Sequence, residues 1–398
     1  MTGPRHFNLL VDFSPTQQHQ RQIILGVSQF CRQYPRFRYR TSASVTLFLK
    51  DAHSVDGVIA LLENDDAAAR YGRPVVNVSS SHLPLPVPTV ATDGRLIGKL
   101  AAEHLLRQGY QSFGCCMDTR FAFSCERLAG FSETVRAAGR PVDAFDTKSL
   151  TEADRVGHVR LAEWLRNQVK PFGLFSHNDL QAVALIDACR EMRLNVPNDV
   201  GIVGVDNDEL LAELARPGLT SVDPGTPLIG YRAAEVLARM IQGESVPNGV
   251  IYLPPRDVVV RESSQSLSLI DERLKAALQF IRQNAARSIG VSDVIDHVPM
   301  SRRSFERLFS TALGISPAEE IRRVRINRAK RLIVEGELRL SAVAGACGYG
   351  AFRNFATAFR REVGVSPDEY RRTFRPGMPI KRPVPKAGRP LPATPPES

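Results

Sequence analysis

Polar side chains directly follow several apolar runs of the sequence, at positions where they could hold a small polar ligand. Asn178 comes after the run at residues 173–176, Asp206 comes after the run at 201–205, and Arg127 lies near the start of an amphipathic stretch. Carboxylates and amides bind sugar hydroxyls through paired donor and acceptor hydrogen bonds, and an arginine donates to hydroxyl or ring oxygens. Turn formation and helix capping are the alternative explanation of the same residues.

A second kind of chemistry is indicated near the C-terminus, where two segments carry side chains at helical spacing. The first set is Arg302, Arg303, Glu306 and Arg307, and the second is Phe352, Arg353, Asn354 and Thr357. Within each set, residues three and four positions apart share one face of a helix. Arginine on guanine, asparagine on adenine and an apolar ring on a thymine methyl are common contacts in the DNA major groove. A solvated helix face, with Phe352 simply packed, is the alternative.

The first two thirds of the chain alternate short apolar runs with amphipathic stretches, which predicts parallel sheets built from strand–helix–strand units. The runs lack polar alternation, as do strands buried on both faces. About 260 residues exceed what one such sheet usually needs, so we expect two lobes, with a ligand in a crevice at the carboxyl ends of the strands. The predicted strands are residues 7–13, 55–60, 74–78, 112–117, 172–176 and 200–205, and the predicted helices are 17–34, 96–108, 127–138 and 182–192.

The last third contains an internal repeat, because a shift of 50 residues places Phe305 on Phe355 and Ser316-Pro317 on Ser366-Pro367, while a shift of 49 superposes the segments before them. Each copy is predicted to be a helix, a tight turn and a second helix with an apolar core face. Ser301 is expected to cap the second helix of the first copy, and Ser341 the first helix of the second copy. Gly348 is expected in the turn of the second copy.

A long helix is predicted between the two copies. Ser316, Pro317 and Glu319 form a capping box with proline at the first helical position, and the helix should run to about residue 335. At 1.5 Å per residue its length is about 27–29 Å, which could hold two recognition helices near the ~34 Å separation of successive major grooves. Its basic side chains could contact DNA phosphates. They are Arg322, Arg323, Arg325, Arg328, Lys330 and Arg331.

Charge is divided unevenly along the chain. Residues 1–264 contain 28 Lys and Arg against 29 Asp and Glu, a net charge of −1, whereas residues 265–398 contain 24 against 13, a net charge of +11. A neutral module joined to a basic one is typical of a protein that binds a polyanion. The sequence has no apolar run of the ~18–20 residues that span a bilayer, no recognisable secretory leader and no CxxC motif. We therefore expect a cytoplasmic protein without metal or cofactor.

The first 264 residues resemble the sugar-binding domain of the LacI family. The resemblance is carried by Arg-Leu-Ala-Gly-Phe at 127–131, Ser-His-Asn-Asp at 176–179 and Val-Pro-Asn-Asp-Val-Gly-Ile-Val-Gly-Val-Asp at 196–206. It implies a two-lobed α/β fold of the periplasmic-binding-protein type (type I), with Arg127, Asn178 and Asp206 in the sugar site. LacI-type regulators begin with a small helix-turn-helix, whereas this sequence begins with a predicted strand, so DNA binding is expected elsewhere.

Residues 270–373 resemble the DNA-binding domain of the AraC family, through the motifs at 340–349 and 355–371. This resemblance implies an all-α domain with two helix-turn-helix units, and the order of the two domains resembles that of xylose-operon regulators. We therefore expect three parts. They are a sugar-sensing domain at 1–264, a DNA-binding domain at 265–374 and a proline-rich, basic, disordered tail at 375–398.

The predicted function is that of a sugar-responsive transcription regulator without enzymatic activity. It would bind double-stranded operator DNA as a homodimer and, by family analogy, activate pentose (xylose-like) catabolic genes with RNA polymerase as a further partner. Repression is an alternative, as are a solute-binding transport protein and a carbohydrate enzyme that uses Asp179 and Asp206 as a carboxylate pair. The basic C-terminal region counts against transport, and the sequence shows no nucleophile–base arrangement beside the carboxylates.

Overall fold

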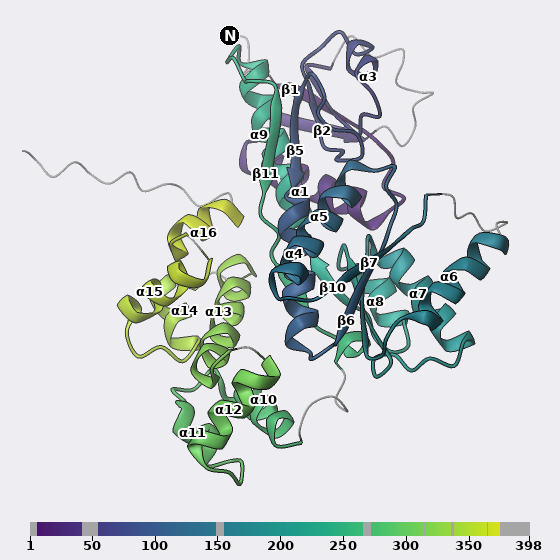
Figure 1. Ribbon diagram of the computed structural model, residues 1–398. Helices are drawn as coiled ribbons and strands as arrows, with labels where there is room; N and C mark the ends of the chain where they lie inside the picture. Colours follow the sequence, from purple (N-terminus) through teal and green to yellow (C-terminus); the bar gives the residue numbers. More distant parts are fainter. Residues whose placement is uncertain are drawn as a thin grey trace, which may run out of the picture.

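The computed structural model describes residues 6–41, 55–148, 155–265, 272–313, 315–335, 338–363 and 365–374. Figure 1 shows two α/β lobes and a helical region beside them. The tail predicted at 375–398 lies outside the described residues. Within these ranges, none of the helices is both long and apolar enough to cross a membrane.

The first lobe is built on a six-stranded parallel sheet in the order β11-β5-β4-β3-β1-β2. Its strands are short apolar runs, and Val11, Ile59 and Val76 are completely buried, as expected for strands covered on both faces. The strands are β1 (Phe7–Asp12), β2 (Phe37–Thr41), β3 (Gly57–Ala60), β4 (Val75–Asn77), β5 (Pro88–Thr92) and β11 (Gly249–Leu253). The helices are α1 (Gln18–Gln33), α3 (Asp66–Ala69) and α9 (Thr226–Ile241).

The second lobe has a similar sheet in the order β12-β10-β9-β8-β6-β7, in which only the β10–β12 pair is antiparallel. Phe131 and Phe175 stack in its core with ring centroids 5.2 Å apart. The strands are β6 (Ser112–Met117), β7 (Val142–Asp146), β8 (Phe172–Ser176), β9 (Val200–Val205), β10 (Thr220–Asp223) and β12 (Asp257–Val259). The helices are α4 (Gly94–Arg107), α5 (Ala122–Ala137), α6 (Arg155–Asn167), α7 (Asp179–Glu191) and α8 (Glu209–Leu214), and a short 3₁₀ turn, η2 (Glu262–Ser264), ends the lobe.

The chain passes between the lobes three times, from β5 into α4, from β10 into α9 and from β11 into β12. These crossings lie side by side, because Thr92 Oγ1 donates to the Pro224 carbonyl (3.0 Å) and the Asp93 amide donates to the Leu253 carbonyl (2.9 Å). Three short connections between two packed bodies form a hinge. The predicted two-lobed, periplasmic-binding-protein-like α/β fold is therefore confirmed.

The remaining described chain is entirely helical and contains both predicted helix-turn-helix units. The helices are α10 (Glu272–Asn284), α11 (Val291–Ile295), α12 (Arg302–Leu313), α13 (Pro317–Glu335), α14 (Leu340–Ala346), α15 (Phe352–Val363) and α16 (Pro367–Phe374). The repeated residues Phe305 and Phe355 are buried in the cores of the two units. Helix α13 has 19 residues, or about 29 Å. Its capping box is confirmed, since the Ser316 amide donates to Glu319 Oε2 (2.7 Å) and the Glu319 amide to Ser316 Oγ (3.3 Å).

Two local predictions were wrong. Ser341 does not cap α14, because the helix already begins at Leu340 and Arg339 occupies the cap position. Helix α5 begins at Ala122, five residues before the predicted start at Arg127. Its first turn faces a cleft rather than the core, so the apolar spacing that marks a helix in a sequence begins only later.

Candidate functional site

The three predicted ligand residues line one cavity of about 330 Å³ between the lobes. Arg127 comes from α5, Asn178 from the loop after β8 and Asp206 from the loop after β9. The structure therefore brings them together at the carboxyl ends of the strands, as expected for this architecture. The first lobe supplies the opposite wall, which consists of Gln17, His19, Gln20, Leu61, Glu63, Ser79, Ser80, Ser81 and His82.

Arg127 is held as a buried donor that faces the cavity. One of its terminal nitrogens donates to the His177 carbonyl, and its guanidinium lies 4.7 Å from the centroid of the Phe123 ring. Its Nε is buried without a hydrogen-bond partner among the described residues. Burial lowers the pKa of Arg127, while the charges of Asp206 and Asp179 oppose that effect. A ligand oxygen at this position would satisfy a donor whose burial already costs free energy.

Asp206 supplies a half-buried carboxylate at the inner end of the same cavity. Its backbone has φ +113°, and Asn207 has φ +48°; such values in residues other than glycine are uncommon and cluster at functional sites. Burial raises the pKa of Asp206 to about 6, against the opposing charge of Arg127. The carboxylate is thus partly desolvated before any ligand enters, which strengthens the hydrogen bonds that it can accept.

Asn178 and its neighbour Asp179 have different positions. Asn178 lines the cavity and caps α7, because its Oδ1 accepts from the Gln181 amide (2.8 Å). Asp179 is only 1% exposed. It accepts hydrogen bonds from Ser221 Oγ (2.6 Å) and from the Asp208 amide (2.8 Å), so it links strand β10 to the loop after β9. The structure therefore does not pair Asp179 with Asp206 in the cavity, as a carbohydrate enzyme would require.

Several cavity residues were not predicted from the sequence. His19 lies in the first turn of α1, and burial followed by the charge of Arg127 lowers its pKa to about 4. It is therefore a neutral ring that can donate and accept. Phe121 and Phe123 stack with ring centroids 5.4 Å apart and also line the cavity. Their position after strand β6 is the signal that could have identified them, because the same rule located Asn178 and Asp206.

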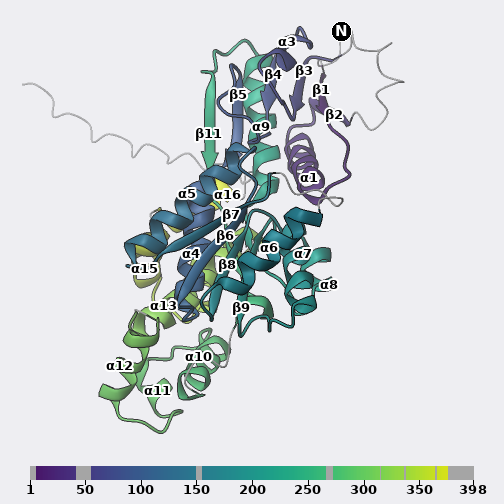
Figure 2. The ribbon, with the colours of Figure 1, turned by 45° about the vertical axis from the view of Figure 1, so that its right-hand side comes forward.

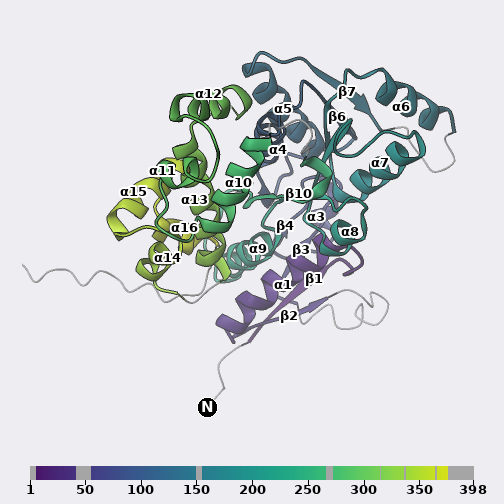
Figure 3. The same cartoon turned by 90° about the horizontal axis from the view of Figure 1, so that it is seen from below.

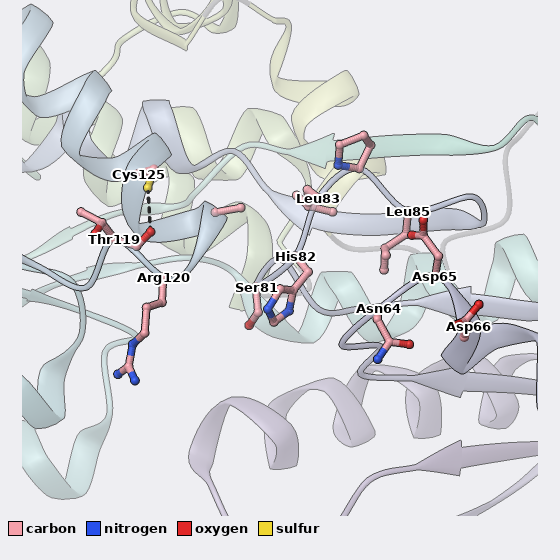
Figure 4. A pocket seen from close by; sticks show the side chains of 12 residues that line it. Asn64, Asp65, Asp66, Ser81, His82, Leu83, Leu85, Thr119, Arg120 and Cys125 are labelled. Carbon is pink, nitrogen blue, oxygen red and sulfur yellow. Dashed lines mark hydrogen bonds between the residues drawn. The ribbon is translucent and has the colours of Figure 1, made fainter. Parts of the chain in front are cut away.

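The two lobes already contact each other across the cleft. The Ala122 amide donates to the Ser81 carbonyl (2.9 Å), and the Phe123 amide donates to the Ser80 carbonyl (3.1 Å). Outside this bridge lies a wider groove of about 690 Å³ (Figure 4), which shares Ser81 and His82 with the cavity. Its other labelled residues include Asp65 and Asp66 from one lobe and Thr119, Arg120 and Cys125 from the other. The cleft therefore has a small enclosed part and an open mouth.

The predicted DNA-reading side chains lie on the outer faces of the second helices of the two helix-turn-helix units. On α12, Arg302 pairs with Glu306 (2.9 Å); on α15, the Thr357 hydroxyl donates to the Arg353 carbonyl (3.0 Å). All eight predicted residues are exposed, namely Arg302, Arg303, Glu306, Arg307, Phe352, Arg353, Asn354 and Thr357. These side chains are therefore available to a double helix.

Besides Arg328, an exposed residue whose Nε donates to the Ala346 carbonyl (3.0 Å), three basic residues of α13 have partners within the protein. Arg322 Nε donates to Glu362 (2.6 Å), and Arg323 forms two hydrogen bonds with Glu320 (2.8 and 2.7 Å). Arg325 donates to three backbone carbonyls beyond α10 at 3.1, 2.9 and 2.8 Å. The structure thus assigns these three residues to internal packing, whereas the sequence analysis expected them on DNA phosphates.

Two protein families match separate parts of the chain. The family described as periplasmic binding protein-like domain matches residues 102–264, and the family described as helix-turn-helix domain matches residues 295–373. The chain is thus a sugar-responsive transcription regulator, in which an α/β sensor of the periplasmic-binding-protein type precedes a DNA-binding domain.

Its similarity to particular regulators extends over most of its length. It is 27% identical to the xylose operon regulatory protein of Haemophilus influenzae over 92% of this chain and 98% of the relative. It is 28% identical to the protein of the same name from Escherichia coli over 90% of this chain and 95% of the relative. Among solved structures, the xylose-binding transcription activator xylR is 26% identical, with a TM-score of 0.60 over 93% of this chain and 99% of that chain. These relatives are transcription regulators.

Proposed function

We propose that the protein binds D-xylose, or a pentose of closely similar stereochemistry, and activates transcription of genes for its use. The observation that carries the proposal is the convergence of Arg127, Asn178 and Asp206 on one cavity between the lobes. The names of the relatives, xylose operon regulatory protein and xylose-binding transcription activator, support the choice of sugar and the sign of the response.

The cavity residues have complementary roles toward such a ligand. Asp206 accepts hydrogen bonds from two neighbouring hydroxyl groups, and Arg127 donates to a ring or hydroxyl oxygen. The Asn178 amide nitrogen supplies a further donor, since its oxygen is used by the cap of α7. The stacked rings of Phe121 and Phe123 offer an apolar surface to the carbon–hydrogen face of the sugar.

DNA binding follows from the two exposed helix faces. We assign Arg303 and Arg307 of α12 to one major groove and Arg353 and Asn354 of α15 to the next, with α13 setting the spacing. Residues 265–374 form the DNA-binding part of this proposal and residues 1–264 the sugar-binding part. Since the target is operator DNA, the protein acts in the cytoplasm of the cell.

We further propose that the active form is a homodimer that recruits RNA polymerase. Helices α7 and α8 together carry three strongly exposed leucines, Leu180 (67%), Leu210 (66%) and Leu214 (65%). Large apolar side chains gathered on neighbouring helices mark an association surface. The same face on a second copy would cover them in a twofold-symmetric contact.

The proposed function is tested by calorimetry and by DNA binding. D-xylose, D-ribose, L-arabinose and D-glucose are titrated into the protein, and anisotropy of a labelled operator fragment is then followed with and without each sugar. The proposal expects D-xylose to bind most tightly and to raise DNA affinity. Failure of all four sugars to bind, or a decrease of DNA affinity with D-xylose, would contradict it; the latter result would indicate a repressor that D-xylose releases from DNA.

A further inference from the structure

A buried carboxylate with basic neighbours lies where the sensor meets the helical domain. Glu320, in the first turn of α13, is only 1% exposed and is held by Arg323. Burial acts to raise the pKa of Glu320, but Arg323, Arg107 and Arg282 together hold it below its usual value. Arg107 belongs to the sensor, where its guanidinium lies 3.6 Å from Glu103, so its charge acts on Glu320 from across the domain boundary without a direct ion pair. A carboxylate removed from water in this way depends on its cationic neighbours.

Helix α4 connects this cluster to the ligand cleft. Its first residues, Gly94 and Ile97, line the inner end of the cavity, and its last residue is Arg107. Fourteen residues span about 21 Å. Figures 1 and 3 both show α4 running beside the helical domain, and α12 contacts it directly. Its last turn also holds the end of the sensor, because His104 Nε2 and Ser264 Oγ form a 2.7 Å hydrogen bond.

Helix α4 is also locked to α5, which carries the ligand residue Arg127. A Cβ atom on Gly98 would lie 2.0 Å from the Arg127 carbonyl oxygen, and a Cβ on Gly130 would lie 2.0 Å from the Arg95 carbonyl oxygen. The two backbones therefore touch, with no side chain between them to absorb a displacement. Packed interfaces of this kind move as units rather than deforming. In Figure 2 the two helices run next to each other along the second lobe.

We propose that α4 and α5 act as one rigid relay, and that the contact of α4 with the helical domain, supported by attraction between the Arg107 charge and the buried Glu320 carboxylate, transmits the state of the cleft to the DNA-binding domain. A sugar that binds Arg127 and Phe123 shifts α5, and α4 moves with α5. The Arg107 end of α4 then moves against α13, the helix that sets the separation of the two recognition helices. This inference rests on the proposed function, since it requires that a sugar changes DNA affinity.

The test compares three variants of the full chain. Arg107→Gln removes the charge at the domain contact, Arg107→Lys keeps it, and Arg95→Gln removes an exposed arginine from the same helix, where it pairs with Glu133 (2.5 Å). For each variant, the dissociation constant for D-xylose is measured by calorimetry. The dissociation constant for a DNA fragment selected by the wild-type protein is measured by anisotropy with and without D-xylose. The ratio of the two DNA constants is the coupling factor.

We expect wild type, Arg95→Gln and Arg107→Lys to show a coupling factor in the range of about 5 to 150. Arg107→Gln should bind D-xylose within about twofold of wild type, because the substitution lies about 21 Å along α4 from the cleft, while its coupling factor falls below about two. A coupling factor of Arg107→Gln equal to that of wild type overturns the relay and leaves the proposed function intact. A coupling factor of one in wild type overturns both.

A measurement on the wild-type protein tests the relay without relying on a variant. Hydrogen exchange of the backbone amides is followed with and without D-xylose. The relay predicts at least a twofold change in exchange rate in the first turns of α13, around Glu320 and Arg323, together with a change in α4. If the sugar protects the cleft residues but leaves the exchange rates in α13 unchanged, the contact does not transmit the occupancy of the cleft.

Discussion

Acidification from pH 7 to pH 5 should weaken sugar binding about tenfold through Asp206. Burial raises the pKa of this carboxyl to about 6, with Arg127 opposing and Asp208 adding to the shift. If only the ionised form accepts the hydroxyl hydrogen bonds, the apparent dissociation constant exceeds that of the fully ionised protein by a factor of about 1.1 at pH 7 and about 11 at pH 5. The difference corresponds to about 1.4 kcal/mol of binding free energy. The loss therefore occurs as the pH falls through the pKa of the folded protein.

The assay is calorimetric titration of D-xylose at half-unit steps between pH 5 and pH 8. The neighbouring rings of His19 and His177 do not contribute in this window, because burial and Arg127 lower both pKa values to about 4. Asp206→Asn is the matched control, since it removes the titration and should make the profile flat, with affinity at pH 7 reduced by at least about 2 kcal/mol. A flat wild-type profile, or a slope that survives in Asp206→Asn, would refute the assignment of Asp206.

Three further outcomes are expected. Without sugar, Asp206→Asn should stabilise the protein at pH 7.5 by up to about 3 kcal/mol. A carboxyl whose pKa is raised on folding stabilises the folded state fully only below its unfolded pKa of 3.8, and it loses that contribution as the pH rises through about 6. A difference in melting temperature between variant and wild type that does not grow from pH 4 to pH 7.5 would contradict this. Gly348→Ala should lower the melting temperature, since Gly348 has φ +75° and an added Cβ would lie 2.4 Å from the Arg287 carbonyl oxygen. A Cβ added at Gly345 in α14 has no atom within 4 Å, so Gly345→Ala should stabilise the protein by about 0.5–1 kcal/mol. Equal effects of the two substitutions would show that the turn tolerates a side chain. In a binding-site selection with the full chain, Arg303→Ala and Arg353→Ala should each cost about 1–3 kcal/mol and relax preference at different base pairs. Arg328 is exposed although its Nε donates to the Ala346 carbonyl, and Arg328→Ala should weaken binding to all sequences alike. Altered preference at the same base pairs in the first two variants would show that the two helices do not read separate grooves.

Much of the fold follows from patterns that are local in the sequence. The strands at residues 112–117, 172–176 and 200–205 coincide with β6, β8 and β9, because a continuous apolar run bounded by turn residues is the signature of a doubly covered strand. The capping box at Ser316 likewise needs only four neighbouring residues to start α13. Local patterns were insufficient for Ser341. This residue is suited to a cap but is the second residue of the helix, after Leu340.

The sequence by itself indicated the duplicated helix pair through spacing within short segments. It indicated the two domain types and the three residues now found around one cavity through motifs that resemble those of the LacI and AraC families. The tertiary structure decided which neighbours those residues have. It placed His19 of the first lobe against Arg127 of the second and turned Asp179 into the core. It buried Glu320, the i,i+3 partner of Arg323, at the domain boundary and placed it under the influence of the Arg107 charge of the sensor. These outcomes depend on packing between segments tens to hundreds of residues apart, and no local periodicity encodes which buried charge meets which partner.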